Sequence, residues 1–336
     1  MKVGIFIDKS ADDREEPIPK NVMHDHKATL GSNKINQMIQ QSKNKFYYVL
    51  LEHLKKKSSQ FKFCRVSNQY PLSDQLIGID ILFPLYLCEN YDDWEIQVQA
   101  CQKHNIPMAI TFEQQDFINN KYSYMKLLQE NNFSCIDTTY IRRNQFVNSS
   151  GNIDHEIVTL LCSELLNKYP NGVILKPSFF GGFSSGFSVV HTKDTDTEIY
   201  EKIKKANINS KTGLFIQPLI SEFRTSFEIK TVWFNGVYKS SYGRNGLGEF
   251  ASFALLDDKC VDVIKCRNIG IEIIQLLFQT HGPFPILRLD FIIQNEVPIL
   301  NEIEYAPAFS YFHTEITILK DLISCICQFL NHQINI

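Results

Sequence analysis

The sequence predicts a mixed α/β protein whose N-terminal third forms an open, mostly parallel sheet. Over residues 2–111, apolar runs of strand length alternate with stretches in which apolar residues recur at helical spacing. This alternation is typical of parallel strands joined by crossover helices. At residues 226–244 and 287–304, two strand-like segments are instead separated by a short run of turn-forming residues, which predicts antiparallel hairpins. We therefore expect α/β and α+β sub-domains in one chain.

The composition is that of an ordinary globular protein. The chain has 336 residues, a formal net charge of -3, 44% hydrophobic residues and 21% charged residues. No basic stripe with interleaved aromatic residues occurs, so we do not expect a nucleic-acid partner. The apolar run at residues 3–7 is too short for the core of a signal peptide, and no later run reaches the ~20 residues of a membrane span. We expect a soluble cytoplasmic protein without a membrane partner.

The cysteines favour free thiols. There are nine of them, an odd number, and they lack the paired spacing of a metal site. Most lie in apolar segments, where cysteine behaves as a small hydrophobic residue. We expect no disulfide framework.

The N-terminal third begins with a buried strand at residues 2–8. A polar stretch follows at residues 9–33 and contains the triplet His24-Asp25-His26. Two histidines and a carboxylate could bind a metal, but the segment offers no third ligand at a useful spacing. A loop on the substrate side is therefore the favoured interpretation.

The rest of this third continues the alternation. The expected helices lie at 35–57 and 91–104, and the expected strands at 60–66, 78–86 and 106–111. No Gly-x-Gly-x-x-Gly motif follows the first strand, so the layout does not indicate a dinucleotide-binding domain.

Two lysines stand out in the middle of the chain. Lys121 falls in the first turn of a helix expected at 119–129, where the helix dipole disfavours a cation. Such a lysine needs either solvent or an anion. Lys176 lies within the apolar run of a strand expected at 172–178. Further helices are expected at 154–168 and 197–207.

A glycine-rich segment at 179–187 lies between the strand at 172–178 and a second strand at 188–191. Its three glycines and two serines could bring backbone N–H groups close to an oxyanion. It is not a Walker A loop, because Gly-Lys-Ser/Thr and the following helix are missing. A plain turn is the alternative.

The C-terminal half is expected to be built on hairpins. A strand at 213–220 is followed by 226–234, which alternates with period two and meets 237–244 across Asn-Gly, the strongest short hairpin signal. The alternation places Glu228 and Lys230 on one face, and Arg244 ends the return strand. Helices are expected at 261–279 and 314–331.

A second hairpin, at 287–304, carries three carboxylates. Glu302 and Glu304 lie two residues apart on one strand and share a face, and the hairpin can bring that face beside Asp290. Acidic side chains on an apolar hairpin are costly unless they are neutralised, and Mg²⁺ binds such carboxylates. The alternative is an edge hairpin with a solvated acidic face.

Taken in order, these segments resemble the ATP-grasp family. The resemblance runs from about Asn119 to Pro307, and residues 2–111 are similar to the domain that precedes the grasp. The matching motifs are Lys121, Lys176-Pro177, 181–186, 217–220, 228–244, Arg288-Leu-Asp290 and Glu302-Ile-Glu304. Each motif is common by itself, whereas their joint order is specific. The resemblance divides the chain into a preceding α/β domain (1–112), a lid sub-domain with the phosphate loop (113–216) and a C-terminal sub-domain with the metal site (217–336).

The resemblance also implies ligands. ATP would be bound with Mg²⁺, for which Mn²⁺ is an alternative. Lys121 and Lys176 would hold the phosphates, and the loop carrying the glycines and serines would close over them. The remaining nucleotide contacts implied are Gly181, Gly182, Ser184, Ser185, Gln217, Pro218, Leu219, Ile220, Glu228 and Lys230. The metal ligands implied are Asp290, Glu302 and Glu304. Arg244 and Arg288, with Lys176, would act catalytically on the negative charge of the transferred group.

The activity implied is that of a carboxylate–amine ligase. ATP would phosphorylate a carboxylate, an amine would attack the acyl phosphate, and ADP and phosphate would be released. The family usually has asparagine where this chain has Glu304. Glu-x-Glu followed by proline is similar to glutathione-synthetase-like proteins and the D-cycloserine-forming cyclo-ligase, and the chain as a whole also resembles D-Ala-D-Ala ligase-like proteins. The substrates would then be an amino acid or short peptide.

Two other functions remain open. A small-molecule kinase on the same fold, of the inositol phosphate type, is one, although a polyphosphate substrate calls for more basic residues than this chain has. A catalytically inactive nucleotide-binding regulator is the other. Grasp ligases often form homodimers through the first domain, and the sequence leaves the oligomeric state open.

Overall fold

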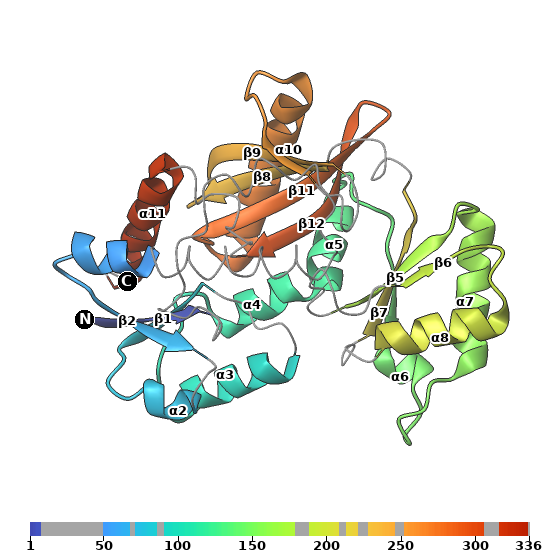
Figure 1. The fold of residues 1–336 in the computed structure, drawn as a ribbon, viewed down its shortest axis with the longest axis horizontal. Coiled ribbons are helices and arrows are strands. Elements are labelled where there is room, and N and C mark those ends of the chain that lie inside the picture. Colours follow the sequence, from blue (N-terminus) through green and yellow to red (C-terminus); the bar gives the residue numbers. More distant parts are fainter. Residues whose placement is uncertain are drawn as a thin grey trace.

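The computed structural model describes residues 1–7, 50–67, 71–85, 91–178, 188–207, 213–220, 228–245, 252–305 and 316–334. The loop expected at 9–33 and the predicted nucleotide contacts Gly181, Gly182, Ser184 and Ser185 lie outside these ranges. Three sheets organise the described residues, and each forms its own part of the molecule (Figure 1). The mixed α/β fold class predicted from the sequence is confirmed, while the boundaries at 112 and 216 stay a prediction.

The N-terminal sheet is parallel, as the alternation predicts. Its strand order is β2-β1-β3, and both neighbours run parallel to β1. The strands are β1 (Lys2–Ile7), β2 (Lys62–Ser67) and β3 (Ile81–Pro84). The associated helices are α2 (Leu72–Gln75) and α3 (Tyr91–Lys103). Residues 50–57 are also helical.

The prediction of a strand at 106–111 is wrong. This segment makes only an isolated bridge between Leu82 and Met108. Pro107 has no N–H to extend a ladder. Thr111 is then the N-cap of a new helix. Its hydroxyl accepts a hydrogen bond from the Gln114 backbone N–H at 3.2 Å, and the Gln114 side chain accepts one from the Thr111 backbone N–H, which together form a capping box.

That new helix changes the context of Lys121. α4 (Phe112–Asn119) and α5 (Lys121–Glu130) replace the single helix expected at 119–129. Asn120 separates them with φ -91° and ψ 93°, values outside the helical region. Lys121 is consequently the first residue of α5, in the first turn as predicted.

The second sheet is entirely antiparallel among its described strands, in the order β4-β7-β5-β6. Its strands are β4 (Thr139–Arg142), β5 (Val173–Pro177), β6 (Ser188–Val190) and β7 (Gly213–Pro218). Its helices are α6 (Arg143–Phe146), α7 (His155–Lys168) and α8 (Asp196–Asn207). Apolar residues from α7 and α8 pack on the strands in one core, and these helices flank the sheet in Figure 1.

The third sheet is the largest and has the order β10-β9-β8-β11-β12. Its strands are β8 (Glu228–Phe234), β9 (Val237–Asn245), β10 (Ser252–Leu255), β11 (Ile286–Gln294) and β12 (Val297–Tyr305). Its helices are α10 (Val261–His281) and α11 (Ile316–Ile334). Both predicted hairpins form, and their turns have consecutive positive φ angles at Asn235 and Gly236 and at Asn295 and Glu296. Turns of this kind match the twist of the strands they join.

No helix within the described ranges is long and apolar enough to cross a membrane. The eight described cysteines are free thiols, as expected.

Replacing Gly270 in α10 by alanine is expected to lower the free energy of unfolding. An added Cβ would lie 2.5 Å from Cζ2 of Trp233, whose buried ring is tethered by a 2.9 Å hydrogen bond from Nε1 to Thr231 Oγ1. Overpacking costs about 1–3 kcal/mol, which exceeds the gain of up to about 1 kcal/mol from helix propensity. Urea unfolding measures the difference. Asn268→Ala, at an exposed site in the same helix, is the matched control and should be neutral or stabilising; equal stability gains in both variants would contradict the close contact.

Candidate functional site

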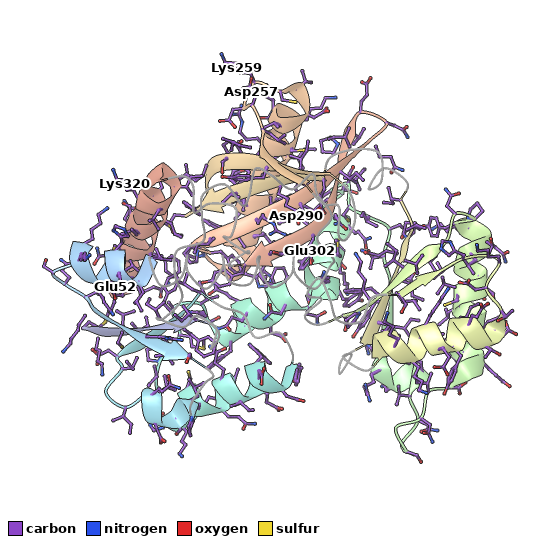
Figure 2. All side chains as sticks on the ribbon, viewed as in Figure 1. Glu52, Asp257, Lys259, Asp290, Glu302 and Lys320 are labelled. Carbon is purple, nitrogen blue, oxygen red and sulfur yellow. The ribbon has the colours of Figure 1, made fainter. Side chains whose placement is uncertain are left out.

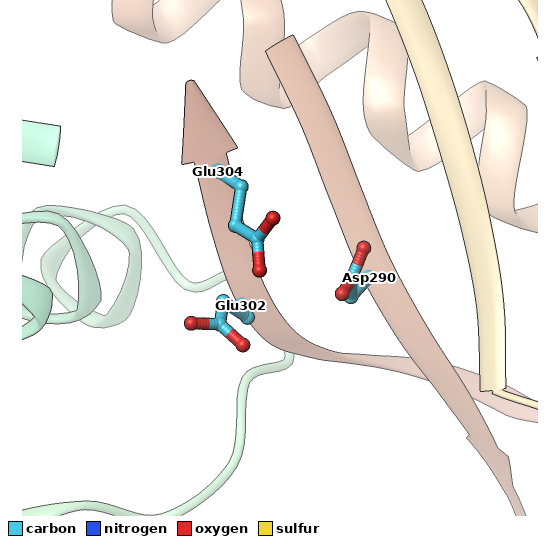
Figure 3. A group of neighbouring side chains, drawn as sticks. All are labelled: Asp290, Glu302 and Glu304. Carbon is cyan, nitrogen blue, oxygen red and sulfur yellow. The ribbon is translucent and has the colours of Figure 1, made fainter. Parts of the chain in front are cut away.

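The three predicted carboxylates meet on the third sheet, which we call the central sheet. Asp290 on β11 lies opposite Glu302 on β12 in the strand register, and Glu304 lies opposite Arg288. One carboxylate oxygen from each of the three acids lies within 4.8 Å of the others. Figure 2 places Asp290 and Glu302 in the middle of the molecule, and Figure 3 shows the three side chains converging from the two strands. We call these residues the acidic trio.

The trio is not the solvated face of an edge hairpin. β12 is an edge strand, but the Asp290 side chain is only 1% exposed and that of Glu302 19%. Buried carboxylates need neutralising partners. The structure supplies them from the protein itself.

Asp290 is held by two cations. Arg288 donates from Nε to Oδ1 at 2.6 Å and from Nη2 to Oδ2 at 2.7 Å, a paired contact two residues away on the same strand face. Lys230, on the neighbouring strand β8, also donates to Oδ2 of Asp290. Lys230 contacts Glu228 at 2.8 Å as well, so the predicted shared face of these two residues is confirmed.

The other two carboxylates have one cation each among the ion pairs of the described residues. Glu304 Oε1 lies 2.8 Å from Nη2 of Arg288. Glu302 accepts from the ammonium group of Lys121. The disfavoured lysine at the start of α5 thus meets an anion, which was one of the two possibilities that the sequence left open.

Lys121 lies where two parts of the molecule join. Its backbone N–H donates to the carbonyl of Ser178, just beyond β5, at 3.2 Å. Its side chain extends to Glu302 on β12 and is 12% exposed. The residue therefore links the second sheet, α5 and the central sheet.

Lys176 projects from β5 toward the same region and is half-buried. Burial and the neighbouring Lys121 ammonium lower the pKa of Lys176 to about 8, although Glu302 and Glu228 act in the opposite direction. The two predicted phosphate-binding lysines are thus close enough to repel each other. A multiply charged anion between them would relieve that repulsion.

The pKa values of the acidic trio depend on the charged side chains that surround each carboxylate. Burial would raise the pKa of Asp290, but Arg288 and Lys230 outweigh it and hold that pKa at about 2. Burial likewise opposes ionisation of Glu302, yet Lys121 and Lys176 keep the pKa of Glu302 below its usual value. Both groups are therefore carboxylates at neutral pH.

Glu304 differs from the other two. Burial raises the pKa of its carboxyl, and the charges of Glu302 and Asp290 add to that effect despite the nearby Arg288. Glu304 is thus the member of the trio that takes up a proton most easily. Its position is the one at which this chain departs from the family pattern.

Asn301 belongs to this site and was missed by sequence reasoning. Asp290 pairs with Glu302 and Phe291 pairs with Leu300, so a β-bulge leaves Asn301 without a partner on β11. Its Nδ2 reaches across to Glu228 Oε1 at 2.8 Å. Regular alternation would have put Asn301 on the opposite face from Glu302, and nothing in the sequence signals the bulge.

The predicted adenine segment lies at the end of β7. Gln217 is buried and donates from Nε2 to Thr138 Oγ1 at 2.8 Å. The backbone N–H of Leu219 donates to the carbonyl of Gly172 at 2.9 Å. Ile220 packs in an apolar cluster with Ile136, Ile292 and Ile299, which joins this segment to the central sheet. Pro218 pairs with Val173 on β5.

Arg244 is placed only through its backbone. It lies opposite Glu228 in the β8–β9 register, beside the charged face. Its side chain lies outside what the structure describes, as does the glycine-rich loop, so their predicted roles stay predictions.

Comparison with known structures identifies the architecture. The sequence matches no family model and no curated protein sequence. Solved structures do match: the D-cycloserine synthetase DcsG has a TM-score of 0.67 at 12% identity, with 98% of this chain and 99% of that chain covered. An ATP-grasp RimK domain protein from Sphaerobacter thermophilus has a TM-score of 0.58 at 8% identity, with 98% and 99% covered. The chain has the ATP-grasp fold.

A third similar structure was determined with nucleotide. It is the D-alanine–D-alanine ligase from Bacillus anthracis complexed with ATP, with a TM-score of 0.61 at 12% identity and 99% of both chains covered. The similarity extends over nearly the whole of each chain, so the N-terminal parallel sheet belongs to the shared ATP-grasp architecture. At these identities the likeness concerns the fold.

Proposed function

We propose that this protein is an ATP-dependent ligase that joins a carboxylate to an amine and releases ADP and phosphate. The observation that carries the proposal is the charged site at the junction of the second and central sheets. Among the described side chains, four carboxylates and four cationic groups gather there, and three of the carboxylates form the acidic trio. A structural site would need no such concentration of buried charge, because apolar packing is at least as stabilising.

The acidic trio fits a hard divalent cation. Its three donors are carboxylate oxygens within 4.8 Å of one another, and Mg²⁺ or Mn²⁺ prefers such ligands. Asp290, Glu302 and Glu304 would hold the ion, with phosphate oxygens and water completing its coordination. When bound, the ion would neutralise charge on the triphosphate.

The chain's own residues would bind and orient the reactants. Lys121 and Lys176 would contact the triphosphate from α5 and β5. A carboxylate oxygen of the substrate would attack the γ-phosphorus, and ADP would leave. The amine would then attack the acyl carbon, expel phosphate and lose a proton. Arg288 and Arg244 would stabilise the negative charge that develops in both steps.

The fold likeness favours a ligase over a kinase. The similar structures include D-alanine–D-alanine ligases, a D-Ala:D-Ser ligase and a D-cycloserine synthetase. We therefore propose an amino acid or short peptide as substrate. A kinase would use the same triphosphate site but would transfer the phosphoryl group to a hydroxyl.

A screen of the purified protein separates these functions. Mg-ATP is supplied with pooled D- and L-amino acids, with short peptides or with inositol phosphates, and ADP and free phosphate are both measured. We expect ADP and phosphate in equal amounts only when amino acids or peptides are present, with a new amide detected by mass spectrometry. ADP without free phosphate would indicate a kinase, and nucleotide binding without any ADP release would indicate a regulator.

A further inference from the structure

Among the side chains that the structure describes, the charges of the site balance without any ligand. The four carboxylates are Glu228, Asp290, Glu302 and Glu304, and the four cationic residues are Lys121, Lys176, Lys230 and Arg288. Their formal charges therefore sum to zero. A metal cation added alone would bring uncompensated positive charge into a largely buried cluster, which is unfavourable.

Glu302 is the carboxylate at which this conflict is sharpest. Its oxygen Oε1 is engaged by Lys121, and it also lies in the acidic trio. A divalent ion contacting Glu302 would lie near the ammonium group of Lys121, and the two like charges would repel. The lysine and a metal therefore compete for the same carboxylate.

Lys121 has an alternative partner within reach of its flexible side chain. Lys176 is close enough for the two ammonium groups to repel, and the backbone of Lys121 is tethered to Ser178 beside the end of β5. An anion bound between the two lysines would attract Lys121 and end this repulsion. The same movement would release Glu302.

We propose that Lys121 stands in for the metal in the nucleotide-free protein, and that a bound triphosphate withdraws it from Glu302 so that the metal can enter. This inference rests on the proposed function, because it requires a triphosphate as the competing anion. Metal and nucleotide then bind with strong positive coupling, and the metal alone binds weakly. Lys121 acts at two positions, as a counter-ion of Glu302 and as a phosphate ligand.

Titration with Mn²⁺ alone tests the inference by the direction in which the Mn²⁺ affinity changes when Lys121 is replaced. Free Mn²⁺ is followed by electron paramagnetic resonance in wild-type protein and in Lys121→Met. We expect the variant to bind Mn²⁺ about tenfold more tightly without nucleotide, since one unit of positive charge beside a ligand is removed. The loss of an ordinary structural contact would weaken metal binding instead.

Two further variants make the result specific. Lys126→Met removes an exposed lysine from the same helix and should leave Mn²⁺ affinity unchanged, because Lys126 pairs with the exposed Glu130 at 3.7 Å and not with the acidic trio. Lys121→Gln removes the charge but keeps a donor for Glu302, so it should also tighten Mn²⁺ binding if Lys121→Met proves unstable by circular dichroism. Unchanged or weaker Mn²⁺ binding in both Lys121 variants would overturn the inference.

A separate arm measures a non-hydrolysable ATP analogue by calorimetry without metal. We expect weaker binding in both Lys121 variants and no change in Lys126→Met. If the analogue binds the wild type but the Mn²⁺ affinity is the same with and without Lys121, the inference fails and the proposed function stands. If Mn²⁺ affinity rises in the variants but no protein binds the analogue, the competition for Glu302 is real and the proposed function fails.

Discussion

Replacing Glu302 by glutamine is expected to abolish ATP-dependent turnover while the protein stays folded. Glutamine keeps the size of the side chain but removes the charge that would hold the metal. We expect the rate of ADP release to fall about 10³-fold or more, the scale seen when charge stabilisation of a transition state is lost. The rate is measured with saturating Mg-ATP and an active substrate pool, and melting is followed by circular dichroism.

Asp290→Asn should give the same loss of activity, with a lower stability. Asp290 is almost fully buried and pairs with both Arg288 and Lys230, so the amide would leave each of these buried cations with one carboxylate fewer. Breaking a buried ion pair from one side costs about 3–5 kcal/mol. Urea unfolding separates this effect from the catalytic one.

Glu304→Asn is the matched control for both variants. It restores the residue that the family usually carries at this position, and the wild-type carboxyl there is already the trio's most easily protonated member. We expect activity within about tenfold of wild type, since amide oxygens also bind Mg²⁺. Full activity in Glu302→Gln would contradict the assignment of Glu302 as a metal ligand.

Replacing Lys176 by alanine is expected to weaken nucleotide binding strongly. A charged hydrogen bond contributes about 1.5–3 kcal/mol, which corresponds to roughly a 10- to 100-fold loss of affinity. Calorimetry with a non-hydrolysable analogue measures it. Lys168→Ala removes an exposed lysine at the end of α7 and should not change the affinity. Equal affinity in Lys176→Ala would show that the phosphates bind elsewhere.

The pKa of Lys176 adds a pH signature to this prediction. Because this pKa is lowered to about 8, a large fraction of the protein carries a neutral Lys176 near that pH. A phosphate contact favours the charged form, so nucleotide binding near pH 8 should take up protons. The uptake should fade as the pH is lowered, where the lysine is already charged. Calorimetry in buffers of different ionisation enthalpy detects it.

Lys176→Arg provides the control for proton uptake. Arginine stays charged at this pH, so binding should proceed with its contribution to uptake lost. The same uptake in Lys176→Arg as in wild type would assign the proton to another group.

Much of the fold followed from local patterns. The Asn-Gly hairpin and the acidic hairpin both form because their turn residues adopt positive φ angles between strands of the right length. The parallel N-terminal sheet follows from alternating strands and helices. The prediction of a strand at 106–111 was wrong because the apolar residues of this segment pack in the core, while its backbone makes no strand pairing beyond the bridge at Met108. Apolar runs of this length do not reveal whether backbone partners are available.

The candidate site was partly predictable for the same reason. Alternation along a strand put Glu228 with Lys230, and Glu302 with Glu304, and these pairs share the charged face. Asn301 was missed because a bulge interrupts alternation, and bulges depend on how two strands pair.

The amino-acid sequence by itself determined which side chains share a strand face and that Lys121 lies in the first turn of a helix, since both depend on residues only a few positions apart. Tertiary structure alone decided the cation–carboxylate pairs whose members are far apart in the sequence. Lys121 and Glu302 are 181 positions apart, and Lys230 and Asp290 are 60 apart. Their contacts arise only when separate sheets and helices pack together, because burial in that junction forces each charge to find a partner.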